Sequence, residues 1–293
     1  MIPRLPRLSV ATPLVALALV AGGCGSAAHH AAPPVVKHTT AKADQGLRVG
    51  LVGNVGFVAA GAYADRGPLS QVSDAPLVLV SSDARSAGAV ADAARAHPDS
   101  HFALVGASAR SFKLPNLVGL LVRDDQAAYV AGLLAGLVGK AAGTTNPAVA
   151  LVGPEEDTIL VSFTAGVHAS DDRVNVTGYP ADPRPASCKE AALGAIAAGA
   201  LAVVGMPGPC TAGVRAAAVE QHVVGQSIAD FELLGAAASA TVREAVHGLY
   251  SGNEDITFGA KAGAIGIAYL DPLVPTAAAV QARAAAQRYA EGS

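Results

Sequence analysis

The sequence predicts an α/β fold built on parallel sheets. From Gly46 onward, short apolar runs rich in Val and Leu alternate with longer alanine-rich segments of helical periodicity. The apolar runs are continuous rather than alternating, which is typical of parallel strands covered by helices on both faces. Several runs end in Gly followed by small or polar residues, as expected where a strand leads through a loop into a helix.

The elements follow from these patterns in chain order. Apolar runs predict strands at residues 47–53, 76–82, 101–106, 116–122, 148–153, 173–179, 201–205 and 222–226. Helical periodicity predicts helices at residues 85–97, 126–139, 189–200, 211–221, 239–252 and 277–292. The alternation of the two kinds of element predicts repeated strand-helix-strand units.

Composition and charge restrict the class of protein. The chain has 293 residues and is 52% hydrophobic, which is enough for a sizeable core. With 20 basic against 23 acidic residues the formal charge is −3, and no basic stripe with interleaved aromatic residues is present. The sequence therefore predicts no nucleic-acid partner.

The first segment has the pattern of a secretory signal peptide, which we assign to residues 1–23. Arg4 and Arg7 precede an apolar run that is too short to span a bilayer. Cys24 follows "AGG", an arrangement that resembles the lipobox of bacterial lipoproteins, although Ala21 stands where that motif usually has a bulky aliphatic residue. In this interpretation Cys24 is acylated and anchors the protein to the outer face of the cell membrane; the alternative is an incidental cysteine.

Residues 24–45 are polar and contain proline without periodicity, which predicts a flexible tether. The His29-His30 pair within it could alternatively bind a metal, but no cluster of further ligands surrounds it. We therefore predict no metal site and no cofactor.

Cys188 and Cys210 fall in a compartment that permits disulfides. A predicted helix and then a predicted strand separate them. In a parallel sheet, the start of such a helix and the end of such a strand share one edge, so the two sulfurs could meet. A disulfide is the favoured interpretation, with free thiols as the alternative.

Signatures of known enzyme classes are missing. "VGLVGNVG" lacks the full dinucleotide-binding fingerprint, and the chain has no P-loop ending, no GxSxG elbow and no HExxH helix. Asp124 and Asp125 could form a general acid/base pair, but adjacent residues at a strand-to-helix joint point in different directions. Acids at a helix start ordinarily act as N-caps. We therefore predict a protein without catalytic activity.

Ligands of parallel α/β sheets lie at the carboxyl ends of the strands, so the loops there supply the candidate residues. Glu155 could contact a ligand at the rim or belong to a solvated turn, and Phe57 and Phe163 could stack on a flat ligand or belong to the core. The candidate ligand-binding residues are Asn54, Phe57, Ser82, Gly106, Asp124, Glu155, Phe163, Gly205, Gln226 and Ser227.

The order of segments from about Ala75 to the end resembles the basic membrane protein family. The similarity is strongest in "PNLVGLLVRDDQAAYVAGLLAGLVGK" and continues through "AVALVGPEED", "LAVVGMPGPCTAG", "HVVGQSIAD" and "GAIGIAYLDPLVP". The resemblance implies a lipid-anchored binding protein of an ABC importer, with purine nucleosides as ligands and an ABC permease as partner. It also implies a two-lobed type I periplasmic-binding-protein fold, with a ligand cleft between the lobes and three crossing segments.

By this resemblance the crossings are "GLLVRDD", a segment near 238–241, and "AIGIAYL". The first lobe comprises residues 46–123 and 240–265, and the second comprises 124–239 and 266–293. Two sheets also suit the number of predicted strands.

The chain departs from the family in the parts that contact nucleosides. Only residues 54–74 lie between the first two predicted strands, so the first lobe is shortened. Gly106 replaces a family Asp, Gly225-Gln226-Ser227 replaces Gly-Val-Asp, and "AAASATV" lacks the family Lys. Charge-assisted contacts to ribose hydroxyls are worth about 1.5–3 kcal/mol each, so their loss predicts weaker nucleoside binding. The alternative function is that of a degenerate relative with a sensory or protein-interaction role; a secreted hydrolase is disfavoured by the missing motifs.

Overall fold

The computed structural model describes residues 46–82 and 84–292. The predicted signal segment 1–23, Cys24 and the tether 24–45 lie outside these residues. Within the described residues, the strands pair in parallel and form two separate sheets. The fold is α/β, as predicted. We call each sheet with its covering helices a lobe.

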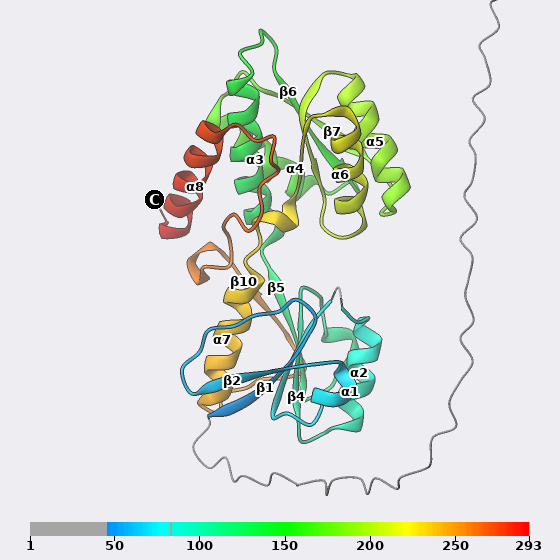
Figure 1. The fold of residues 1–293 in the computed structure, drawn as a ribbon, viewed down its shortest axis with the longest axis vertical. Coiled ribbons are helices and arrows are strands. Elements are labelled where there is room, and N and C mark those ends of the chain that lie inside the picture. The colour runs from blue at the N-terminus through cyan, green and yellow to red at the C-terminus, as the bar shows by residue number, and fades with distance from the viewer. Residues whose placement is uncertain (1–45, 83, 293) are drawn as a thin grey trace, which may run out of the picture. The chain divides into compact units, whose positions relative to one another are not determined.

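The first lobe is built on six described strands in the order β10-β5-β4-β3-β1-β2 (Figure 1). Its strands are β1 (Leu47–Val52), β2 (Ala62–Arg66), β3 (Leu77–Ser81), β4 (His101–Val105), β5 (Leu117–Val122) and β10 (Asp255–Phe258). Its helices are α1 (Leu69–Val72), α2 (Ala87–Ala96), the 3-10 turn η1 (Arg110–Phe112) and α7 (Leu234–Val246).

Both faces of this sheet are buried, because successive strand residues point to opposite sides. Leu77 and Leu79 of β3 pack in the core that α7 covers. Val78 and Val80 pack in the core that α1 and α2 cover. The continuous apolar run in the sequence therefore reflects burial on both faces.

The shortened part of the first lobe is the connection between β1 and β2. Parallel neighbours are usually joined by a helix, but residues 53–61 form a loop that runs beside α7. The Val58 N–H donates to Ser239 Oγ at 2.8 Å, and the Ser239 hydroxyl donates to the Gly235 carbonyl at 2.6 Å. Val55 is buried in the core under α7. This loop takes the place that a crossover helix would occupy.

The second lobe is built on four described strands in the order β7-β6-β8-β9. Its strands are β6 (Ala148–Gly153), β7 (Asn175–Pro180), β8 (Ala200–Gly205) and β9 (Val224–Ser227). Its helices are α3 (Asp124–Ala141), α4 (Asp157–Ser170), α5 (Pro185–Ala197), α6 (Pro209–Gln221) and α8 (Thr276–Glu291), with the 3-10 turns η2 (Ile228–Phe231) and η3 (Ala260–Ala262). Helices α3 and α4 cover one face of the sheet and α5 and α6 the other, while α8 lies along α3 (Figure 1).

Helices α3 and α4 approach each other closely through glycines. A Cβ added at Gly132 of α3 would lie less than 3.0 Å from the Phe163 carbonyl oxygen of α4. A Cβ added at Gly166 of α4 would lie equally close to the Tyr129 carbonyl oxygen of α3. The backbones therefore touch where side chains would ordinarily separate two helices.

Cys188 and Cys210 are joined by a disulfide, with their Cα atoms 5.1 Å apart. Cys188 lies in the first turn of α5 and Cys210 in the first turn of α6, directly after β8. The disulfide therefore lies at the edge of the second sheet where β8 ends and where α5 and α6 begin, as predicted.

The chain passes between the two sheets at three places. The first passage is at Arg123, between β5 and α3, as predicted; the Arg123 N–H donates to the Phe258 carbonyl at 2.9 Å. The third passage is at Gly259, just after β10. The segment 264–270, predicted as this crossing, instead runs beside the second passage, with the Leu233 N–H donating to the Ala264 carbonyl at 2.7 Å.

The predicted second crossing, near residues 238–241, is wrong. Ala238 and Thr241 are buried inside α7, which begins at Leu234. The second passage therefore precedes α7, at Glu232 and Leu233. The core of the first lobe accordingly includes chain before residue 240, while Ala264 and Ile265 pack in the core of the second lobe. The segment 240–265 that was predicted for the first lobe therefore differs at both ends from the chain that packs in the core of that lobe.

Among residues 46–82 and 84–292, no helix combines the length and the hydropathy that a membrane span requires.

Candidate functional site

The carboxyl edge of each parallel sheet is the candidate site, because the strand-to-helix loops gather there. In the first lobe these loops follow β1, β3 and β4 and carry Asn54 and Phe57, Ser82, and Gly106 respectively. In the second lobe the loop after β6 carries Glu155, while Gly205 is the last residue of β8 and Gln226 and Ser227 are the last two residues of β9. Asp124 is the first residue of α3.

At the edge of the first sheet, Ser82 and Gly106 lie side by side. The Ser82 N–H donates to the Val105 carbonyl at 3.0 Å, and a Cβ at Gly106 would lie 3.0 Å from Ser82 Oγ. Gly106 has φ +86°, a conformation that favours glycine. Because Gly106 has no side chain, only its backbone lies beside the half-buried Ser82.

Asn54 and Phe57 belong to the loop that replaces the crossover helix. Asn54 is exposed. Phe57 is half-buried and packs against the core under α7. Asn54 is therefore accessible to a ligand, whereas part of the Phe57 ring is covered by the core under α7.

At the edge of the second sheet, a pocket of about 140 Å³ opens between the loop after β6, the start of α4 and the end of β7. Its polar lining comes from Glu155, Glu156, Asp157 and Tyr179. Ligand pockets usually measure about 300–1,000 Å³. This pocket alone would therefore hold only part of a small molecule.

The charged joint before α3 is arranged differently from the predicted caps. Arg123, with extended backbone, occupies the N-cap position, and Asp124 and Asp125 form the first turn. The Arg123 guanidinium donates two hydrogen bonds to Asp125, at 2.8 and 2.7 Å. This contact holds the pKa of Asp125 below its usual value. The prediction of an aspartate N-cap was therefore wrong by one position, although acids in the first turn still favour the helix dipole.

The pKa of Asp124 is raised, first by burial of its carboxyl and then by the negative charges of Glu156 and Asp125. Replacing Glu156 with Gln should lower this pKa, because the second cause disappears. When folding raises the pKa of a carboxyl, the free energy of unfolding falls as the pH rises from the unfolded pKa through the raised folded pKa. The E156Q variant should therefore gain stability over the parent near pH 7 and show no gain near pH 3, where the Asp124 carboxyl is protonated in both proteins. Carboxyl NMR titration and denaturation at the two pH values test this.

The matched control is E190Q, which neutralises an exposed glutamate on α5. It should leave the titration of Asp124 unchanged. An unchanged Asp124 titration in E156Q would contradict the repulsion between the Glu156 and Asp124 carboxylates.

Three candidate residues are directed into the protein. Phe163 is 0% exposed and belongs to the core of the second lobe, because it falls within α4 rather than at its start. Gln226 and Ser227 are 1% and 0% exposed. Gly205, at the end of β8, is also buried. In this structure, therefore, Phe163, Gln226 and Ser227 present no side chain on the surface, and Gly205 has none to present.

Gln226 and Ser227 are held by a polar network that the sequence argument missed. The Asp230 carboxylate accepts hydrogen bonds from the Ser227 N–H at 2.8 Å and the Gln226 side chain at 3.2 Å, and it pairs with Arg215. Gln226 Oε1 accepts from the Asp271 N–H at 2.6 Å. We call this set the β9 network. The Ser-x-x-Asp spacing at 227–230, a capping-box pattern, was the available signal.

The β9 network also fixes the chain that follows the third passage. The Asp230 carbonyl accepts from the Ala268 N–H at 2.8 Å, and the Arg215 guanidinium lies 4.7 Å from the centre of the Tyr269 ring. Burial raises the pKa of Asp230, whereas the Ser227 N–H and the Arg215 charge act in the opposite direction. The carboxyl edge at β9 is thus occupied by the protein's own chain.

Neither a family model nor a curated protein matches the sequence. Among solved structures, an ABC transporter solute-binding protein from Conexibacter woesei DSM 14684 aligns with a TM-score of 0.53 and 17% identity, covering 84% of this chain and 97% of that chain. A transcriptional activator of the comK gene from Bacillus halodurans aligns with a TM-score of 0.55 and 12% identity, covering 84% and 98%. These similarities establish the fold, which is of the periplasmic-binding-protein type.

Proposed function

We propose that this protein is an extracytoplasmic, lipid-anchored substrate-binding protein of an ABC importer, without catalytic activity of its own. The observation that carries the proposal is the pocket at the carboxyl edge of the second sheet, in a fold of the periplasmic-binding-protein type. The signal pattern and Cys24 support the location. The C. woesei protein, described as a solute-binding protein of an ABC transporter system, supports the role.

The ligand is a small polar molecule, nucleoside-like by the family resemblance. Ser82 and Asn54 offer uncharged hydrogen-bonding groups at the first edge, and Glu155 and Tyr179 offer a carboxylate and a phenol at the second. Such groups suit hydroxyls and amides. Because Gly106 stands where the resembled family has a carboxylate, the preferred ligand differs from a purine nucleoside in detail.

Calorimetric titration of the full-length protein in detergent tests this function. Inosine, adenosine, guanosine, free bases and small sugars are titrated in turn, and each is also tested by thermal unfolding. A true ligand at about 100 times its Kd should add about 2.7 kcal/mol of stability. Absence of any binding or stabilisation across these compounds would overturn the importer proposal.

A substitution in the pocket ties the binding to this site. E155Q should weaken ligand binding about tenfold, because a charge-assisted hydrogen bond is replaced by a neutral one. E190Q, on an exposed part of α5, should leave the affinity unchanged. Equal affinities in both variants would place the ligand elsewhere.

The lipid anchor has a separate test. Mass spectrometry of the membrane-bound protein should find an acylated Cys24 at the mature N-terminus. An unacylated N-terminus would remove the anchor from the proposal and leave the binding role standing.

The second candidate is a degenerate binding protein with a sensory or protein-interaction role. The β9 network favours it, because Gln226 and Ser227 serve the protein's own chain at an edge where family members contact ligand. The B. halodurans protein of similar fold is described as a transcriptional activator. This candidate predicts no small-molecule binding at the carboxyl edges.

A further inference from the structure

The disulfide lies beside both chain segments that form the pocket at the carboxyl edge of the second sheet. Residues 153–155 and residues 178–180 line that pocket, and we call them the β6 wall and the β7 wall. The Ala181 N–H, directly after the β7 wall, donates to the Gly153 carbonyl of the β6 wall at 2.9 Å. This hydrogen bond is the junction that sets how far apart the two walls lie.

One sulfur of the disulfide packs on each side of this junction. Cys210 Sγ lies 3.6 Å from the position that a Cβ would take on Gly153, a position that the Met206 side chain also crowds. Cys188 Sγ lies 3.4 Å from the carbonyl oxygen of Asp182, which follows the β7 wall. The bond therefore supports the chain on both sides of the junction.

The surroundings of the disulfide leave little room for two separate thiols. Cys188 and Cys210 are 0% and 1% exposed, and Met206 beside them is buried as well. Two unbonded sulfur atoms need more space than two bonded ones, and a close-packed interior does not supply it. Opening the bond would therefore press a sulfur against Gly153 or Asp182 and loosen the junction between the walls.

Helices α5 and α6 have other contacts that keep them together without the bond. A Cβ added at Gly213 of α6 would collide with the Pro185 carbonyl oxygen of α5, so the two backbones touch. The Lys189 ammonium of α5 also forms a 2.8 Å ion pair with the Glu220 carboxylate of α6. Loss of the disulfide should therefore disturb the walls of the pocket without separating the two helices.

We propose that formation of the Cys188–Cys210 disulfide completes the pocket, so that the protein binds its ligand at full affinity only in the oxidised form. The proposal rests on the proposed function of that pocket. In the reaction both thiols lose their protons, the two sulfurs join, and two electrons pass to the disulfide of an external oxidant, which becomes a dithiol. Extracytoplasmic compartments supply such oxidants, and the signal pattern predicts export. Ligand binding would then begin only after the protein has left the cytoplasm.

Amide hydrogen exchange tests the brace without any ligand. The oxidised full-length protein in detergent is compared with the same protein refolded in a phosphine reductant. Reduction should quicken exchange of the Ala181 and Met206 N–H groups about tenfold, because the junction opens locally. The melting temperature should fall by about 5–10 °C.

A second variant keeps the test valid if the reduced protein does not refold. C188A/C210A carries neither thiol, so exchange at Ala181 should quicken here too, although less than in the reduced protein, because no sulfur presses on the walls. Unchanged exchange at Ala181 and Met206 in both forms would overturn the proposal, even if the melting temperature falls.

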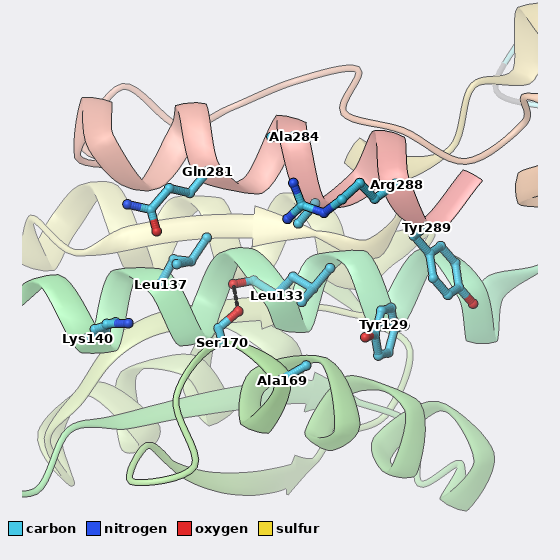
Figure 2. Close-up of a pocket in the computed structure, with 11 residues that line it drawn as sticks. Tyr129, Leu133, Leu137, Lys140, Ala169, Ser170, Gln281, Ala284, Arg288 and Tyr289 are labelled. Carbon is cyan, nitrogen blue, oxygen red and sulfur yellow. Dashed lines mark hydrogen bonds between the residues drawn. The ribbon is translucent and has the colours of Figure 1, made fainter. Parts of the chain in front are cut away.

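The hollow between α3 and α8 is the internal reference, because it lies on the sheet face opposite α5 and α6. There the Ser170 hydroxyl donates to the Leu133 carbonyl at 2.8 Å (Figure 2). Exchange around this contact should not change on reduction. The matched control is Asp230→Ala, which breaks the β9 network away from both walls and should leave exchange at Ala181 unchanged.

A ligand measurement then separates this proposal from the importer function. A compound that binds the oxidised protein in the calorimetric series is titrated into the reduced protein. Its affinity should fall about tenfold if about a tenth of the reduced molecules keep the walls aligned, and it should return on reoxidation. Equal affinities in the two forms would overturn the proposal. If no compound binds either form, the importer function fails, whereas quickened exchange at Ala181 would still support the brace.

Discussion

Replacing Gly132 with alanine is expected to lower the free energy of unfolding by about 3 kcal/mol, although alanine is the better helix former. The added methyl group would press on the Phe163 carbonyl oxygen, which belongs to the backbone of α4 and cannot rotate away. The two helices would have to separate. Because α4 covers one face of the second sheet, separation also disturbs the core in which Phe163 is buried.

Chemical denaturation measures the effect, with Gly194 as the matched control. Gly194 is an exposed helical glycine of α5 whose added Cβ would meet no atom within 4 Å. Gly194→Ala should raise the free energy of unfolding by about 0.5–1 kcal/mol. Opposite signs for the two substitutions support the backbone contact, and a stabilising Gly132→Ala would refute it.

Removing the Asp230 carboxylate is expected to cost about 3 kcal/mol. Asp230→Ala leaves the Arg215 guanidinium without its ion pair and deprives the Ser227 N–H and the Gln226 amide of their acceptor. Removing one partner of a buried ion pair costs about 3–5 kcal/mol, and the partial exposure of Arg215 places this pair at the lower end. Hydrogen exchange of the Ala268 N–H should quicken, because loss of the carboxylate loosens the turn η2 whose carbonyl at residue 230 accepts that N–H.

The control for Asp230 is Asp182→Ala, which breaks the exposed pair of Asp182 with Arg184. This change should cost less than about 1 kcal/mol. A double-mutant cycle with Arg215→Ala isolates the coupling between the buried partners. Equal costs at Asp230 and Asp182 would mean that the β9 network contributes little to stability.

The sequence predicted the interior strands of both sheets and the edge strands of the second sheet, but it missed the edge strands of the first sheet. Strands β3, β4, β5, β6 and β8 are continuous apolar runs because helices cover them on both faces. The edge strands β2 and β10, "AYADR" and "DITF", have no such run and were missed. An edge strand has one neighbour and more contact with solvent, so its pattern is weaker.

The start of α7 and the second passage could not be located for a related reason. "LGAAASA" has no capping side chain to mark where the helix begins. The family resemblance therefore predicted a crossing near residues 238–241, where α7 in fact continues. The first passage was predicted correctly because Arg123 and the acids after it mark a clear change from strand to helix.

For the candidate site, strand order predicted which loops gather at each edge, but it could not predict which way side chains turn. Ser82 and Gly106 do lie together. Gln226 and Ser227 turn inward because Asp230, one helical turn further on, supplies their partner. Side-chain direction at a strand end depends on such tertiary partners, which a linear pattern does not contain.

The chain order of the two lobes also determines which sheet is fully synthesised first. All strands of the second sheet lie between Ala148 and Ser227, whereas the first sheet needs β10 and α7, which come after Leu233. During synthesis the second sheet is therefore complete while the face of β3 that carries Leu77 and Leu79 has no helix over it. The apolar face of β3 therefore stays uncovered until α7 (Leu234–Val246) has been synthesised.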